Sequence, residues 1–351
     1  MECKLATDVI PFAGVNLRIV RRDISGDDAG DTDASPTSNA DGEDDDDDWV
    51  DPNFFDDGYT VAATTGFCRV WEGAEVLTRL LEDDSGDDTS LRRRVAGKRV
   101  LELGAGVGLC GIAAASAGAH VMCTDLEAVV EGVIYRNIGE NTDTSSETGT
   151  LTAPSSSLSP PWRMSEHIAG GNGGTCVAQV LDWTTSIDAS IEAQRRLGRR
   201  RRVLSREDTT GATSWPCIGK DDDDDDDDAH GVNDPRDCEL VMAAECLWLR
   251  ELVDPFCETV TDLMRAARER RGIELPCVLS FRDRSSKDKD KDKDADDEGG
   301  ESPLGAFVPV SDVVSAFEAK GCGWRTLHTS PSTEDAGYHV HVFEITPPPV
   351  A

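Results

Sequence analysis

The stretch Lys98-Arg-Val-Leu-Glu-Leu-Gly-Ala-Gly-Val-Gly-Leu109 decides the fold of this chain. It joins a short apolar strand, residues 100–103, to a small-residue helix predicted over residues 109–117. Between them stand glycines at alternate positions, Gly104, Gly106 and Gly108. Glycine lets the backbone turn tightly and come close to a ligand, and a helix N-terminus offers unpaired N–H groups. The stretch therefore predicts a nucleotide-type binding loop at the end of a strand.

Outward from this loop, apolar strands alternate with helical stretches. Strands are predicted over residues 15–20, 99–103, 120–124, 176–181, 240–244, 277–281, 324–327 and 339–345. Helices are predicted over residues 70–81, 109–117, 126–138, 250–270 and 310–320. This alternation predicts an α/β fold, a parallel sheet covered by helices on both faces. A turn around residues 331–337 separates the last two strands, so we expect them to pair antiparallel.

The formal net charge of −34 is concentrated in a few segments. Residues 27–51 hold twelve acids and no Lys or Arg, and eight consecutive Asp stand at 221–228. Blocks of like charge repel one another and bury no core, so both are predicted to be disordered. The Lys/Asp alternation at 287–294 is a third predicted solvated segment. The arginines at 199–202 suggest a nuclear signal, but a solvated loop is favoured. No broad cationic face is present, so nucleic acid is not expected as a partner.

Every gap falls between elements of one continuous alternation, so we expect one domain with inserted segments. Residues 1–23 are its N-terminal strand region, and residues 24–57 are a disordered acidic insertion. The main part is predicted over residues 58–347, with low-complexity insertions at about 142–174, 184–236 and 283–303.

The cysteines and the hydropathy of the chain limit the classes of protein to which it can belong. The eleven cysteines are odd in number and include no C-x-x-C pair, which indicates neither a metal site nor a disulfide framework. No apolar run approaches the ~18 residues of a membrane span, and the N-terminus lacks a signal-peptide pattern. We expect an intracellular, cytoplasmic monomer that does not bind membranes, with a nuclear location as the second expectation.

Residues able to carry chemistry follow four predicted strands at their carboxyl ends, where ligands bind in parallel sheets. They are Glu102, Gly104, Ala105 and Gly106 at the first strand, Asp125 at the second, Trp183 at the third, and Ala244, Glu245 and Trp248 at the fourth. An acid about twenty residues beyond the loop usually takes ribose hydroxyls, but Asp125 by itself equally fits a helix N-cap. Trp183 also fits a core edge, and Glu245 a solvated loop acid. Their joint placement favours the functional interpretation.

A dinucleotide site is the competing interpretation of the loop. Gly106-Val-Gly108-Leu-Cys-Gly111 is literally G-x-G-x-x-G. In that register, however, the first glycine stands three residues beyond the strand. The Glu102 carboxylate would also repel a pyrophosphate, whereas it suits a ribose or a cationic ligand.

Glu102-Leu-Gly-Ala-Gly-Val-Gly108 resembles motif I of the class I S-adenosylmethionine-dependent methyltransferases. The wider pattern, over about residues 11–345, resembles methyltransferase family 16, the protein-lysine methyltransferase-like group. It includes V-W-x-x-A-x-x-L at residues 70–77, Asn137-Ile-Gly-Glu-Asn141 at a helix end and Trp183 after the third strand. Together these are more specific than motif I alone.

The resemblance implies a Rossmann-like seven-stranded sheet, mostly parallel, with an antiparallel last strand and helices on both faces. It implies S-adenosyl-L-methionine as the cofactor. The positions implied to contact it are Trp71, Gly104, Ala105, Gly106, Asp125, Trp183 and Ala244. The residue chemistry agrees, because Asp125 can accept ribose hydroxyls, Trp183 can pack against adenine and Glu102 suits the sulfonium side.

The resemblance also implies methyl transfer to a lysine of a protein substrate, with Glu245 and Trp248 as catalytic residues. Family members mostly carry Asp and Tyr at these two positions. Glu keeps the charge and reaches one methylene further, while Trp keeps an aromatic wall but loses the hydroxyl. A small-molecule amine therefore stays open as the acceptor. A third hypothesis is a non-catalytic cofactor-binding module that recruits a basic partner.

Overall fold

The computed structural model describes residues 5–23, 66, 68–83, 89–143, 159–170, 172–207, 232–283, 308–334 and 337–349, with backbone alone for 199–207. The acidic segments predicted at 24–57 and 221–228 and the Lys/Asp alternation at 287–294 lie outside these residues. So does the predicted insertion at 283–303, apart from Asp283.

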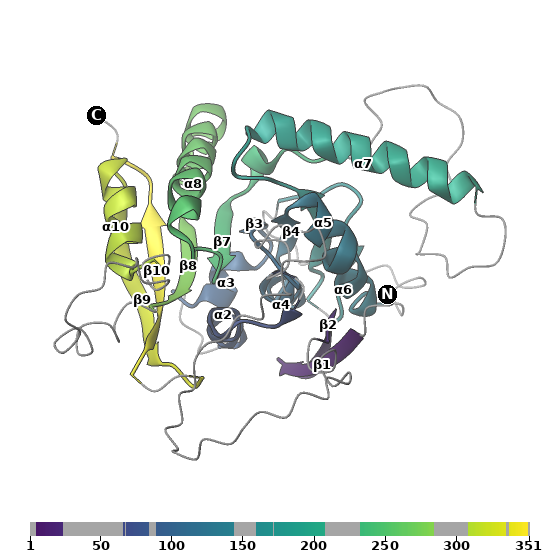
Figure 1. Cartoon of the computed structure of the whole chain (residues 1–351), viewed down its shortest axis with the longest axis horizontal. Coiled ribbons are helices and arrows are strands. Elements are labelled where there is room, and N and C mark those ends of the chain that lie inside the picture. Colours follow the sequence, from purple (N-terminus) through teal and green to yellow (C-terminus); the bar gives the residue numbers. More distant parts are fainter. Residues whose placement is uncertain are drawn as a thin grey trace, which may run out of the picture.

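A single large sheet forms the centre of the described chain, in the order β5-β6-β4-β3-β7-β8-β10-β9 (Figure 1). Its strands are β3 (Arg99–Leu103), β4 (His120–Asp125), β5 (Glu166–His167), β6 (Thr175–Val180), β7 (Leu240–Ala244), β8 (Cys277–Arg282), β9 (Gly323–Pro331) and β10 (His339–Thr346). The five central strands are parallel, and β10 pairs antiparallel with both β8 and β9. The α/β fold and the antiparallel last strand are thus confirmed. The sheet has eight strands and not the predicted seven, because the two-residue β5 pairs antiparallel with β6 at one edge.

Helices cover both faces of this sheet (Figure 1). They are α2 (Glu72–Glu82), α3 (Leu91–Val95), α4 (Leu109–Ser116), α5 (Glu127–Val129), the π-helical turn η2 (Val130–Ile134), α6 (Tyr135–Glu140), α7 (Ile187–Glu207), the 3-10 turn η5 (Pro235–Asp237), α8 (Arg250–Arg271) and α10 (Val310–Ala319). Val100 on β3 packs into the core beneath α2 and α4, whereas Leu101 and Leu103 pack beneath α8 and α10. Burial on both sides explains why the central strands are continuous apolar runs. Across the described ranges, no helix combines the length and the apolar composition that a bilayer span requires.

An N-terminal hairpin of β1 (Leu5–Phe12) and β2 (Val15–Arg22) stands apart from the large sheet. Residues 15–20 are therefore a strand, as predicted, but their partner is β1, which the sequence analysis did not predict. The hairpin contributes Phe12, Leu17 and Ile19 to the core under α2 and α4. It forms an attached layer and not an additional strand of the central sheet.

Asn137 on α6 holds this hairpin and the glycine loop together. Its side chain is fully buried and accepts a hydrogen bond from the N–H of Val20, at 2.7 Å. Its amide group donates to the carbonyl oxygen of Val20 at 2.9 Å and to that of Val107 at 2.7 Å. One turn later, Asn141 bonds the backbone N–H and carbonyl of Arg18 in the same way. The Asn-rich helix end is thus a structural clamp.

Two of the predicted low-complexity insertions are partly ordered, which corrects their bounds. Residues 184–236 include α7, because Ile191 and Leu197 place an apolar stripe on one side of a helix that is otherwise polar. The arginines at 199–202 continue this helix and do not form a loop. In the insertion predicted at 142–174, Trp162 is 4% exposed and its indole donates to the carbonyl of His120 at 2.8 Å.

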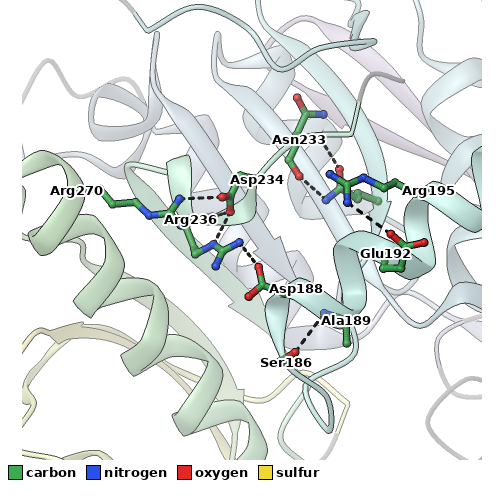
Figure 2. Close-up of polar contacts among 10 residues, drawn as sticks. Ser186, Asp188, Ala189, Glu192, Arg195, Asn233, Asp234, Arg236 and Arg270 are labelled. Carbon is green, nitrogen blue, oxygen red and sulfur yellow. Dashed lines mark hydrogen bonds and ion pairs between the residues drawn. The ribbon is translucent and has the colours of Figure 1, made fainter. Parts of the chain in front are cut away.

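A cluster of ion pairs joins the two ordered ends of the second insertion (Figure 2). Arg236 bonds Asp234 at 2.7 Å and reaches Asp188, in the first turn of α7, at 2.5 Å. Arg270 near the end of α8 bonds the other oxygen of Asp234 at 2.8 Å. Because these pairs are partly exposed, each adds little stability. They nevertheless connect α7, the segment before β7 and α8 to one another.

Candidate functional site

A pocket lies at the carboxyl ends of the central strands, where the order of the sheet reverses around β3. From β3 the chain continues to β4 on one side and returns later to β7 on the other. Such a reversal opens a crevice above the sheet. The pocket there measures about 320 Å³, which is within the range of ~300–1,000 Å³ common for ligand sites.

The structure brings all the residues singled out from the sequence to the wall of this one pocket. They are Trp71, Glu102, Gly104, Ala105, Gly106, Asp125, Trp183, Ala244, Glu245 and Trp248. Residues that the sequence analysis missed also line it, among them Gly66, Arg69, Asp182 and Cys246. Asp182 and Cys246 belong to the same strand-end stretches as the predicted residues, but neither was assigned a role in the site from the sequence.

Gly104 turns the chain out of β3 at a position where a side chain would be both strained and crowded. Its φ is +62°, in the left-handed region. A Cβ at this position would lie 2.8 Å from the Cβ of Cys246 and 3.0 Å from the ring of Trp183. Gly104 and Gly106 line the pocket, while Gly108 is the N-cap of α4. The turn that faces the pocket therefore starts at Gly104, the register favoured from the sequence.

Asp125 fastens the glycine loop to the end of β4. Its carboxylate accepts the N–H of Gly106 at 2.9 Å and that of Leu126 at 2.8 Å. Leu126, not Asp125, is the N-cap residue of α5. Each carboxylate oxygen still has a lone pair for a ligand hydroxyl. Burial raises the pKa of Asp125 to about 6, so the group is ionised at neutral pH.

Glu102 lies beneath the loop, on the face of β3 that is turned toward α4. It is 2% exposed, and its Oε2 atom has no hydrogen-bond partner among the described residues. Burial raises the pKa of Glu102 to about 8. The carboxyl group therefore tends to keep its proton near neutral pH, and a cation entering the pocket would favour its ionised form.

This burial makes the stability of the ligand-free protein depend on pH. The pKa of Glu102 is about 8 in the folded chain, above its ordinary value of 4.5. Its contribution to stability is therefore fully present below pH 4.5 and is lost as the pH rises through 8. Glu102→Gln is expected to raise the Tm at pH 8 and to flatten the decline of Tm between pH 6 and 8. Thermal melts of both proteins across this range test the expectation, and parallel profiles would contradict it.

Aromatic side chains form further walls of the pocket. Trp183 packs edge-on against Phe256, with ring centroids 5.2 Å apart, and its indole N–H has no partner within the described part of the chain. Across the pocket, the guanidinium of Arg69 lies 4.4 Å above the ring of Trp71 and pairs with Glu334 at 2.6 Å. Arg69 and Glu334 are 265 positions apart, so no local sequence signal could have joined them.

Glu245 is a buried residue with an unusual backbone conformation. It is 6% exposed, so its interpretation as a solvated loop acid is wrong. Its φ is +54°, a left-handed value that costs a non-glycine residue energy and is common at functional sites. Its N–H donates to the carbonyl of Ser280 on β8 at 2.9 Å. The strand β8 thus fixes the direction in which this side chain leaves the backbone.

The pocket offers little for thiolate or metal chemistry. Burial raises the pKa values of Cys110 and Cys246 well above the usual thiol value, so both are neutral thiols at pH 7. Within the described ranges, no three His, Cys, Asp or Glu side chains gather in a group that could hold a metal ion.

Comparisons with known proteins agree with the resemblance found in the sequence. Residues 61–152, which include α2, β3, the glycine loop and β4, match a family model described as lysine methyltransferase. Protein N-lysine methyltransferase METTL21A of Danio rerio is 46% identical over 72 residues, which are 20% of this chain and 29% of that protein. The chain thus matches less than a third of this relative's length.

Two solved methyltransferase structures resemble the chain at low sequence identity. Magnesium protoporphyrin IX methyltransferase (ChlM) from Synechocystis PCC 6803 with bound SAH has a TM-score of 0.38 and 12% identity, over 84% of this chain and 91% of that chain. A TehB-like SAM-dependent methyltransferase from Corynebacterium glutamicum has a TM-score of 0.33 and 12% identity, over 79% and 88% of the two chains. These scores are too low to carry an argument about the site.

Proposed function

We propose that this chain, whose residues 61–152 match a family model described as lysine methyltransferase, is a class I S-adenosylmethionine-dependent methyltransferase of family 16 and transfers a methyl group from that cofactor to an amine. The favoured acceptor is a lysine side chain of a protein. The description of the matched family and the partial similarity to an N-lysine methyltransferase support this choice. A small-molecule amine is the alternative acceptor.

The observation that carries the proposal is the acidic and aromatic wall of a single pocket. Glu102, Asp125, Asp182 and Glu245 line it, together with several indole rings. Arg69 is the sole basic residue among the described lining residues, and Glu334 pairs with it. Such a wall disfavours the pyrophosphate of a dinucleotide. It suits two positively charged groups, a sulfonium and an amine.

The residues present fit S-adenosylmethionine, which supplies a methyl group activated on a sulfonium. Gly104 and Gly106 line the pocket without side chains, so the backbone of this turn is itself part of the wall that a ligand can approach. In the proposed arrangement, Asp125 accepts the ribose hydroxyls and Trp183 packs on the adenine, beside the Gly104-Ala105-Gly106 turn. Glu102 faces the cationic end. Trp71 and Ala244 complete the wall.

In the proposed reaction the lone pair of the acceptor nitrogen forms the new N–C bond as the S–C bond breaks. A free lysine has a pKa of ~10.4, so it must lose a proton before it attacks. Glu245 would accept a hydrogen bond from the amine and direct its lone pair along the line of displacement. Trp248 would cover the amine and exclude water. The proton leaves to solvent, so Glu245 acts as a positioning group more than as a strong base.

Asp125→Ala is expected to lower the affinity for S-adenosylmethionine by about 1–3 kcal/mol, which is roughly 5- to 150-fold. The variant removes the acceptor for the ribose and also frees the N–H groups of Gly106 and Leu126. Isothermal titration calorimetry measures the affinity, and a melt of the free variant checks that it is folded. If the folded variant binds S-adenosylmethionine with unchanged affinity, Asp125 does not bind the ribose hydroxyls.

The acceptor is best identified by incubating the purified protein with labelled S-adenosylmethionine and a cell lysate. Mass spectrometry of the labelled material then locates the methyl group. A modified lysine that is labelled more weakly with the Asp125→Ala protein, at a cofactor concentration below saturation, supports the proposal. If small metabolites are labelled and proteins are not, the acceptor is a small-molecule amine. Cofactor binding without transfer to any acceptor would favour the non-catalytic module.

The remaining expectations about partners and location belong to the same proposal. The acidic composition of the chain favours a basic protein substrate, and we further propose that the protein is a cytoplasmic monomer. Size-exclusion chromatography with light scattering, and imaging of the tagged full chain, test these two expectations separately from the chemistry.

A further inference from the structure

The side chain of Glu245 occupies the space that a side chain at Gly73 would need. Gly73 stands in the first turn of α2 and is buried. A Cβ built there would lie 2.6 Å from Cγ, 2.7 Å from Oε1 and 3.0 Å from Cδ of Glu245. Any residue larger than glycine at position 73 therefore displaces the carboxylate of Glu245.

Both residues are tied to the same anchor, Ser280 on β8. Ser280 is fully buried, and its hydroxyl donates to the carbonyl oxygen of Gly73 at 2.8 Å. Its own carbonyl accepts the N–H of Glu245 at 2.9 Å. These two hydrogen bonds hold the backbones of residues 73 and 245 close to the same serine. The Glu245 side chain therefore has little room to move away from position 73.

Glycine at position 73 is not explained by helix formation. Within a helix, alanine is more favourable than glycine by about 1 kcal/mol. Gly73 has no left-handed φ that would require glycine. Gly139 on α6 shows the ordinary case, since a Cβ there would meet nothing within 4 Å. The absence of a side chain at 73 thus follows from its contact with Glu245.

We propose that Gly73 is a positioning residue that sets how deep the Glu245 carboxylate lies in the pocket. The inference rests on the proposed function, because it assigns the glutamate to the acceptor amine. A glutamate is one methylene longer than an aspartate, and the space above Gly73 takes up that length. With alanine at 73, the shorter aspartate becomes the acid that fits at 245.

The experiment compares wild type with Gly73→Ala, Glu245→Asp and the double variant, and uses Gly139→Ala as a matched glycine-to-alanine control. Gly73→Ala is expected to lower kcat about tenfold or more, since small misplacements of a positioning group are costly. The affinity for S-adenosylmethionine, measured by calorimetry, is expected to stay the same. Adding Glu245→Asp to Gly73→Ala is expected to recover part of the lost kcat. Gly139→Ala is expected to keep wild-type kcat.

Thermal stability provides a readout that needs no acceptor. Crowding in Gly73→Ala is expected to lower the Tm by about 2–10 °C, and Gly139→Ala is expected to leave it equal or higher. Glu245→Ala introduced into Gly73→Ala should restore part of the loss. If the changes in log kcat and in Tm of the double variants equal the sums of the changes in the single variants, the inference is overturned. If the Tm changes are not additive but the protein transfers no methyl group to any acceptor, the Gly73–Glu245 contact is supported and the proposed function is overturned.

Discussion

Replacing Glu245 by glutamine is expected to lower kcat for methyl transfer by at least about 100-fold, because the acceptor amine loses the carboxylate that orients it. Glutamine has nearly the same shape, so the contact with Gly73 and the buried position are kept. The affinity for S-adenosylmethionine is expected to stay unchanged. The loss should therefore occur in the transfer step and not in cofactor binding.

Steady-state kinetics on the identified acceptor measures kcat and KM, and calorimetry measures cofactor affinity. Glu75→Gln is the matched control, because it makes the same change at an exposed acid on α2. This control is expected to keep wild-type kcat. A Glu245→Gln protein that retains its kcat would show that Glu245 has a structural role alone.

Replacing Asn137 by alanine is expected to lower the free energy of unfolding by about 3–5 kcal/mol. The change leaves the N–H and carbonyl of Val20 and the carbonyl of Val107 without their buried partner. It loosens the hairpin and the glycine loop together. We therefore also expect weaker binding of S-adenosylmethionine, although Asn137 does not line the pocket.

Urea denaturation followed by circular dichroism measures this loss. Arg18→Ala is the matched control, since it breaks an exposed ion pair, Arg18–Glu140 at 3.3 Å, between the same strand and the same helix. Exposed pairs of this kind contribute about 0–1 kcal/mol. If the two variants lose equal stability, the buried asparagine is not the clamp that the geometry indicates.

Local features of this chain can be predicted from its sequence more accurately than features that depend on distant residues. The strands beside the glycine loop and the helix after it were predicted nearly to the residue, because glycine spacing and apolar runs are local signals. The helix α7 was missed, since its polar and arginine-rich sequence stands next to a long acidic run. The strands β1 and β5 were missed for other reasons, because Pro11 within β1 argues against a strand and β5 has only two residues.

The residues singled out from the sequence line one pocket for a topological reason. In a parallel sheet the carboxyl ends of all strands meet at one edge, so a list of residues that follow strands is also a list of neighbours. What such a list lacks is orientation. It placed Glu102 at the tip of a strand, but not its burial beneath α4, which raises its pKa to about 8. It named Glu245 as a catalytic residue or a solvated loop acid, but not its burial against Gly73.

The sequence by itself determined the succession of strands and helices along the chain, the glycine turn and the set of side chains at the strand ends, since each depends on residues close together in the chain. Tertiary structure alone decided how these side chains are held. Gly73 with Glu245, Cys246 with Gly104, and Arg69 with Glu334 are contacts between distant parts of the chain. Folding brings them within a few ångströms, and at that distance a single missing Cβ decides where a carboxylate lies. The glycine loop thus identifies the kind of site, while contacts across the fold determine its chemistry.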